Sequence, residues 1–164
     1  MSQSTSRARE YLIVLLVLAL AGVAAWWIFG LTWEVQVTPS DGMAPAKELG
    51  LTGRFLYPYA GFIGVVALAA VAGILATKKY GRIIIGVLLA LLAGSAVVQI
   101  VTDFGVRGVA IGAEVALTVI TGCAVVTVIR GSAWPMLGSK YERTKPKESE
   151  SAWDQLDRGE DPTL

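Results

Sequence analysis

The sequence predicts an all-α membrane protein: a four-transmembrane-helix bundle with both termini in the cytoplasm and a largely flexible C-terminal tail. Apolar residues make up 54% of the 164-residue chain and are gathered into four long runs. Basic residues are distributed unevenly between the two sides of these runs, and the composition changes abruptly after Arg130. An α-helix needs about 20 apolar residues to cross a bilayer, and continuous runs without strict alternation favour helices over barrel strands.

The predicted transmembrane domain covers residues 11–130. Its spans are residues 11–33, 55–77, 83–102 and 108–129. The first run follows Arg7 and Arg9, as the apolar part of a signal peptide would. It continues well past the small residues that could mimic a cleavage site, through Trp26 and Trp27. We therefore interpret it as an uncleaved membrane anchor.

Basic residues predict the orientation, because the loops on the cytoplasmic side of a membrane protein carry more Lys and Arg. With four spans, one side receives the N-terminus (residues 1–10), the loop after the second span and the tail, with Arg7, Arg9, Lys78, Lys79, Arg82, Arg130, Lys140, Arg143, Lys145 and Lys147. The other side receives Lys47, Arg54 and Arg107. We expect a multi-pass protein of the plasma (inner) membrane with both termini in the cytoplasm.

The first loop on the opposite side has turn residues at Pro39, Asp41, Gly42 and Pro45. Its opening segment "WEVQVT" alternates weakly, which is typical of a short extended piece. The loop is too short to form a domain.

Composition also bears on chemistry. The chain has no His, and its single Cys is Cys123, so an intrachain disulfide and a Cys/His zinc site are excluded. There is no catalytic set and no glycine-rich phosphate loop. We expect no enzyme activity, no cofactor, no metal site and no nucleic-acid partner.

Small residues recur four apart within the runs, a spacing that lets helices in a membrane approach closely. The pairs are Gly108/Gly112, Ala69/Gly73, Gly86/Ala90 and Ala90/Gly94. These faces either pack the four helices together or contact another membrane subunit, and they permit a homo-oligomer.

Polar residues near the outer ends of the last two spans form a predicted intramembrane polar site: Gln99, Asp103, Arg107 and Glu114. A carboxylate in a span should face the bundle or a wet cavity. Glu114 is either a structural partner of Arg107 or Gln99, or a proton or cation site. Four tryptophans are predicted at membrane interfaces, where indole rings concentrate: Trp26, Trp27, Trp33 and Trp134.

The tail, residues 131–164, divides into a basic interfacial part around Trp134 and an acidic part. In the acidic part, Ser151 and Asp154 resemble a capping box, and Trp153 and Leu156 would share one helical face. So short a helix is marginal alone, which indicates a peptide that orders on a protein partner. The predicted partner-binding residues are Trp153, Leu156, Asp157, Arg158 and Asp161. The alternative is a disordered, solubilising tail.

Two tail segments, "WPMLGSKYER" and "AWDQLDRGEDPT", resemble the C-terminal signature of the tryptophan-operon-associated membrane proteins of actinobacteria. The "LTG" of Leu51, Thr52 and Gly53 before the second span is similar to that family as well. The resemblance implies four spans, an actinobacterial inner membrane and a link to tryptophan metabolism. It transfers no functional residues.

Two functions remain open. The first is a small accessory or scaffold subunit that sits in the lipid bilayer and docks a protein partner through its tail. The second is a transporter or exporter of a small aromatic or indole-type solute that uses Glu114. A membrane-anchored enzyme is the third class, and no motif supports it.

Overall fold

The computed structural model describes residues 2–38, 47–104 and 108–134. The chain divides into two units, Met1–Trp134 and Pro135–Leu164, and the description that follows concerns the first. Its elements, in order, are α1 (Ser2–Ile28), β1 (Thr32–Thr38), β2 (Lys47–Thr52), α2 (Gly53–Leu56), α3 (Pro58–Ala76), α4 (Lys79–Phe104), α5 (Val109–Arg130) and the 3-10 turn η1 (Gly131–Ala133).

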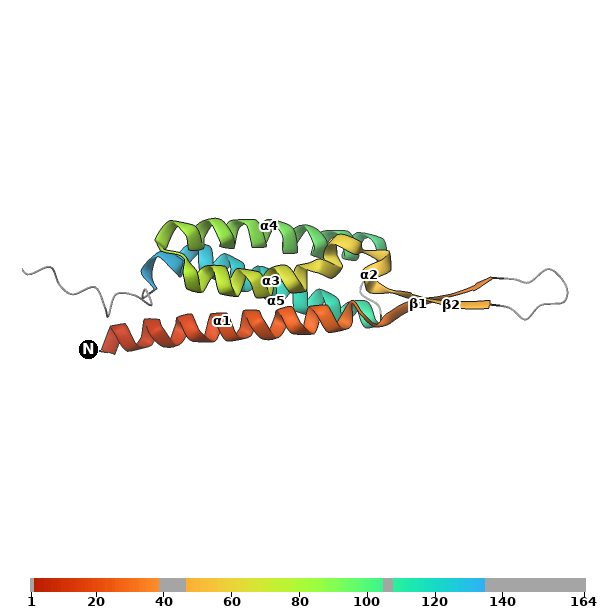
Figure 1. Ribbon diagram of the computed structural model, residues 1–164, viewed down its shortest axis with the longest axis horizontal. Coiled ribbons are helices and arrows are strands. Elements are labelled where there is room, and N and C mark those ends of the chain that lie inside the picture. The colour runs from red at the N-terminus through yellow and green to blue at the C-terminus, as the bar shows by residue number, and fades with distance from the viewer. Residues whose placement is uncertain (1, 39–46, 105–107, 135–164) are drawn as a thin grey trace, which may run out of the picture. The chain divides into compact units, whose positions relative to one another are not determined.

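Four helices run side by side and alternate in direction along the chain (Figure 1). Each is long and apolar enough to cross a membrane: Ser6–Ile28, Pro58–Ala76, Lys79–Asp103 and Val109–Ala133. The helix α1 packs on α3 and α5, and α4 packs on α5 and α3, which closes a square bundle. The predicted four-helix membrane domain is confirmed. One end of the bundle holds the start of α1, the α3–α4 connection and the end of α5, and is here called the base; the other is the hairpin end.

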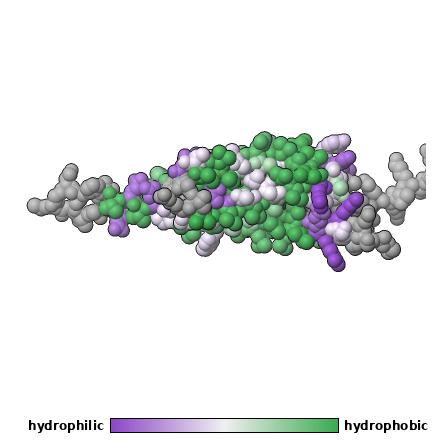
Figure 2. Space-filling view, turned by 180° about the vertical axis from the view of Figure 1, so that it is seen from behind, coloured by the Kyte–Doolittle hydropathy of each residue, from purple (hydrophilic) through white to green (hydrophobic). Residues whose placement is uncertain are grey.

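Apolar side chains cover the outside of this bundle as well as its inside. Leu12, Leu16 and Leu20 of α1 and Leu88, Leu91 and Val98 of α4 are all more than half exposed. Figure 2 shows the result as a broad hydrophobic band with hydrophilic residues gathered beyond both of its edges. So large an exposed apolar surface is typical of a lipid-facing surface.

The hairpin end corrects two parts of the sequence prediction. The described chain is mostly helical but not all-α, because β1 and β2 pair as an antiparallel hairpin. The first span, predicted as 11–33, ends as a helix at Ile28. The chain turns at Gly30, and the β-branched residues of "TWEVQVT" favour an extended strand from Thr32 onward. The turn residues predicted at 39–45 lie outside the described residues.

Trp33 fastens the hairpin to the bundle. Its indole Nε1 donates a hydrogen bond to the Ile28 carbonyl at 3.1 Å. A Cβ added at Gly53 would lie 2.5 Å from the Trp33 ring, so only glycine fits beneath the indole. This contact gives a physical reason for the glycine of the "LTG" segment. After α2, Pro58 starts α3, where its missing N–H costs nothing.

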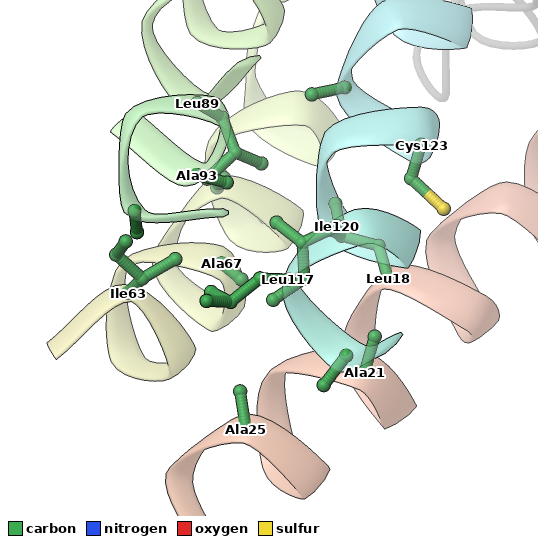
Figure 3. Close-up of a cluster of buried hydrophobic side chains, with 14 of the residues drawn as sticks. Leu18, Ala21, Ala25, Ile63, Ala67, Leu89, Ala93, Leu117, Ile120 and Cys123 are labelled. Atoms are coloured by element: carbon green, nitrogen blue, oxygen red, sulfur yellow. The ribbon is translucent and has the colours of Figure 1, made fainter. Parts of the chain in front are cut away.

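The interior of the bundle is apolar, and Figure 3 shows a cluster of its buried hydrophobic side chains. Residues from all four spanning helices meet there and are almost fully buried: Leu18, Ala25, Ile63, Ala67, Leu89, Ala93, Leu117 and Ile120. Alanines alternate with larger side chains, which brings the helix backbones close together. The described side chains at the centre of the bundle are therefore apolar.

Among the glycine contacts between described helices, the closest joins α1 and α3. A Cβ added at Gly64 would lie 2.6 Å from the Gly22 carbonyl oxygen, which fixes the crossing of these two helices. Gly86 makes a similar approach to α5, where its added Cβ would lie 3.0 Å from the Ala124 oxygen. The predicted pair Gly108/Gly112 does not form one close-packed face. Gly108 precedes α5 with a φ of 56° and has nothing near its Cβ position.

Candidate functional site

Glu114 lies on the buried face of α5, in the half of the helix nearer the hairpin. Its exposed fraction is 7%, and it follows Ala110 and Ala113 and precedes Leu117 on the stripe that faces the bundle. Among the described residues, nothing donates a hydrogen bond to its buried Oε1. A buried carboxylate oxygen without a donor is costly, which makes Glu114 the strongest candidate for a functional polar residue inside the described bundle.

Neither Gln99 nor Asp103, the other described members of the predicted polar site, makes a hydrogen bond to Oε1 of Glu114. Gln99 is half-buried on α4 and makes no hydrogen bond to Glu114. Asp103, at the end of α4, instead accepts a hydrogen bond at 3.3 Å from the hydroxyl of Tyr57. The pKa of the Tyr57 phenol is raised above its usual value, mainly because the residue is buried and to a lesser extent because the Asp103 carboxylate lies nearby. Arg107 lies outside the described residues.

Arg54 ties the start of the α2–α3 segment to the end of α1. Its Nη2 donates to the Trp26 carbonyl oxygen at 2.6 Å, and its guanidinium lies 3.5 Å from the centre of the Trp26 ring. The backbone N–H of Arg54 donates to the Phe29 oxygen at 2.9 Å. A cation stacked on an indole is a stabilising pair. The sequence prediction had treated Arg54 only as a loop charge.

The aromatic residues divide between interface and interior. Trp27 is 71% exposed and fits the predicted interfacial position, and Trp26 lies beneath Arg54. Trp33, however, packs between Phe29 and Tyr57, with ring centres 5.0 and 6.0 Å away. It therefore holds the hairpin on the bundle rather than lying free at the membrane surface.

Arg82 is the largest fully buried side chain of the described bundle, and the sequence analysis did not name it as a site residue. Only 1% of it is exposed. Its Nε donates to the Ile74 oxygen at 3.1 Å, its Nη1 donates to the Trp134 oxygen at 3.2 Å, and its guanidinium lies 5.0 Å from the centre of the Tyr11 ring. One arginine therefore joins α4 to α3, to α1 and to the segment after α5.

Trp134 also departs from its prediction. We expected it in an interfacial stretch against lipid headgroups, but it is buried at the base, with its ring centre 5.2 Å from that of Tyr11. The reason is η1, which turns the chain back across the base directly after α5. Beside it, Arg130 forms an ion pair with Glu10 at 2.9 Å.

An open apolar groove of about 500 Å³ lies between α1 and α5, on the lipid-facing side. Small residues on both helices create it: Ala21, Ala24, Gly112 and Ala116. Glu114 does not line this groove. The residues predicted to bind a partner, Trp153, Leu156, Asp157, Arg158 and Asp161, lie outside the described residues.

A protein-family model described as "tryptophan-associated transmembrane protein" matches residues 15–163. The match covers most of the first span, the whole of the other three, and the tail that carries the sequence signature. The chain belongs to this family. As a tryptophan-associated transmembrane protein, it is a multi-pass membrane protein of a family linked to the tryptophan operon.

No curated protein matches the chain, and no solved structure does. The assignment to the tryptophan-associated transmembrane proteins therefore brings no activity and no residue roles from a relative. The actinobacterial origin implied by the resemblance stays a prediction. What Glu114, Arg82 and the tail do has to be argued from the residues themselves.

Proposed function

We propose that the protein is an accessory or scaffold subunit of the plasma membrane, whose bundle presents the C-terminal tail to a protein partner. The packed interior of the bundle is the observation that carries this proposal. Below Glu114, α5 continues with Leu117, Ile120 and Ala124, each at most 1% exposed. An interior filled in this way suits an anchor better than a pathway for a polar solute.

The distribution of charge supports an arrangement with both termini in the cytoplasm. Within the described residues, the base carries Arg7, Arg9, Lys78, Lys79, Arg82 and Arg130, while the hairpin end carries Lys47 and Arg54. By the positive-inside rule the base faces the cytoplasm. The tail follows Trp134 at the base and would then extend from the cytoplasmic side.

Replacing Trp153 by alanine should remove the main apolar contact of the tail with its partner. Interface tryptophans commonly contribute about 2 kcal/mol or more to binding, so the amount of co-purified partner should fall at least tenfold. The measurement is affinity purification from native membranes in mild detergent, followed by mass spectrometry of the bound proteins.

Trp27→Ala is the matched control, because it removes an exposed tryptophan from the opposite end of the bundle. It should leave the partner set unchanged. If Trp153→Ala recovers the same partners in the same amounts as the unmodified chain, the tail is not the docking element.

One observation favours a second candidate function, transport of a small aromatic or indole-type solute. Glu114 has a buried oxygen with no donor among the described residues, and an unpaired carboxylate within a span is a natural proton or cation site. In this case Glu114 would exchange a proton as the bundle opens, and the exposed Trp27 at the hairpin end would stack on the solute.

For transport, Glu114→Gln should abolish proton-coupled flux of indole or tryptophan into proteoliposomes, since the amide keeps the shape but cannot titrate. Glu34→Gln is the matched control, because it neutralises an exposed carboxylate on β1 at the same end of the bundle, outside the predicted polar site. Flux that persists at the unmodified rate in Glu114→Gln would remove this candidate function.

A further inference from the structure

The base of the bundle contains a small pocket that differs in character from the apolar surface around it. It has a volume of about 280 Å³ and is lined by Arg7, Glu10, Arg130, Ala133 and Trp134. The residues come from the first turns of α1 and from the end of α5 with the turn that follows. These are the points at which the two spans end, so the pocket lies at the level where lipid phosphates lie.

The charges that line this pocket leave a positive excess. Arg130 is 63% exposed and forms an ion pair with Glu10. Arg7 is exposed and makes no hydrogen bond or ion pair with another described residue. Two guanidinium groups therefore face one carboxylate, and a guanidinium can bind two oxygens of a phosphate at once.

A second, independent observation comes from the indole of Trp134. The residue is only 5% exposed, and its Nε1 is buried without an acceptor among the described residues. A buried indole N–H normally has a hydrogen-bond partner. Trp134 also lines the pocket, and we infer that a small rotation of the indole would bring this N–H to an anion bound there.

The pocket is held in place from behind. Arg82 donates to the backbone oxygen of Trp134 at 3.2 Å, and the Trp134 ring packs on Tyr11. Because these contacts hold the backbone of η1 and Trp134 in place before any ligand arrives, little backbone ordering cost remains for binding.

The surroundings identify the kind of anion. Leu12 and Ile13 on α1 and Ile129 on α5 are each at least 60% exposed. They follow or precede the pocket residues Glu10 and Arg130 by one to three positions in the sequence, on the part of the surface that faces lipid. A ligand seated there has hydrocarbon on one side and two arginines on the other. This combination matches a phospholipid, and it does not match a soluble anion.

We propose that this pocket binds the headgroup of one anionic phospholipid from the leaflet on the base side. The lipid phosphate lies between Arg7 and Arg130, the indole N–H of Trp134 donates to a headgroup oxygen, and the acyl chains lie along the outer surface of α1 and α5. Nothing in this arrangement depends on the tail or on Glu114.

The test is native mass spectrometry of the full-length protein, released from detergent after incubation with phosphatidylglycerol or with phosphatidylcholine of the same acyl chains. One phosphatidylglycerol should stay bound where phosphatidylcholine is lost. A basic residue near an anionic lipid surface contributes about 1 kcal/mol. Arg7→Gln and Arg130→Gln should therefore each weaken retention of phosphatidylglycerol roughly fivefold. Trp134→Phe, which keeps the ring but loses the N–H, should weaken it as well.

Arg9→Gln is the matched control, since it removes an exposed positive charge from the same helix but does not line the pocket. It should retain phosphatidylglycerol as the unmodified chain does. Equal loss in Arg9→Gln and Arg7→Gln would show attraction by general charge and overturn the proposal. Equal retention of the two lipids would also overturn it, as would complete displacement by millimolar inorganic phosphate, which would indicate a site for a soluble anion.

Discussion

Gly64→Leu is expected to prevent the bundle from assembling. A Cβ at Gly64 would already lie 2.6 Å from the Gly22 oxygen and 2.8 Å from the Trp26 nitrogen. Both are backbone atoms of α1 and cannot turn aside as a flexible side chain would. Overpacking in a well-packed core costs about 1–3 kcal/mol, so Gly64→Ala should lose this much and leucine more. Two quantities should be measured in mild detergent. Size-exclusion chromatography gives the yield of monodisperse protein, and a thermal melt gives the midpoint of unfolding.

Gly122→Ala provides the control for this prediction. Gly122 is exposed on α5, with nothing within 4 Å of its Cβ position. Alanine there should be neutral or slightly stabilising, because it favours the helix over glycine by roughly 1 kcal/mol. If Gly64→Ala and Gly122→Ala have the same thermal midpoint, α1 and α3 do not cross at Gly22 and Gly64.

Arg82→Ala should have the second-largest effect. It removes two hydrogen bonds from a charged donor, each of which contributes about 1.5–3 kcal/mol. The Ile74 and Trp134 carbonyl oxygens lose this donor, and the missing side chain leaves a cavity beside Tyr11. We expect a loss of about 3 kcal/mol or more in the free energy of unfolding, measured as loss of near-ultraviolet circular dichroism in mixed micelles.

Lys79→Ala is the comparison for Arg82, because it removes an exposed positive charge from the same end of the same helix. Its effect should stay within about 0.5 kcal/mol. The loss of stability in Arg82→Lys should lie between those of Arg82→Ala and Lys79→Ala. A lysine ammonium group cannot donate to both carbonyl oxygens with the geometry of the planar guanidinium group. A thermal and chemical stability of Arg82→Ala equal to that of Lys79→Ala would show that the base is not held together by this side chain.

Hydropathy alone located the four spans, because the number of residues that crosses a bilayer is fixed by its thickness. The hairpin was only half anticipated. The strand β1 alternates visibly, whereas "KELGLT" in β2 has a central Gly50 and charged residues at its start. Its pairing depends on register with a distant segment, which periodicity within one strand does not reveal.

Arg82 illustrates a signal that was present and not used. The positive-inside rule treats every basic residue in a connecting segment as a solvated charge. Yet Arg82 precedes Leu89 by seven residues, and Ala93, Ala96 and Ile100 continue the same buried stripe of α4. Helical spacing could therefore have placed it on the bundle face. Glu114 was predicted to face the bundle for a different reason, the cost of a carboxylate in contact with lipid, and the structure buries it.

The helix contacts show the limit of motifs read within one helix. Pairs of small residues four apart were the sequence signal, and Gly86 does pack closely against α5. The tightest contact, however, joins Gly22 of one helix to Gly64 of another. Such a pair becomes visible only after two helices have been placed against each other.

If the membrane bundle presents its tail to a protein partner, removal of the tail should release that partner. The most direct measurement compares partners co-purified with the full-length chain and with a chain truncated before Glu148, both extracted from native membranes in mild detergent. We expect defined partners with the full-length chain and their loss on truncation, with the truncated bundle still monodisperse. The same partners on both chains, or none on either, would contradict this expectation.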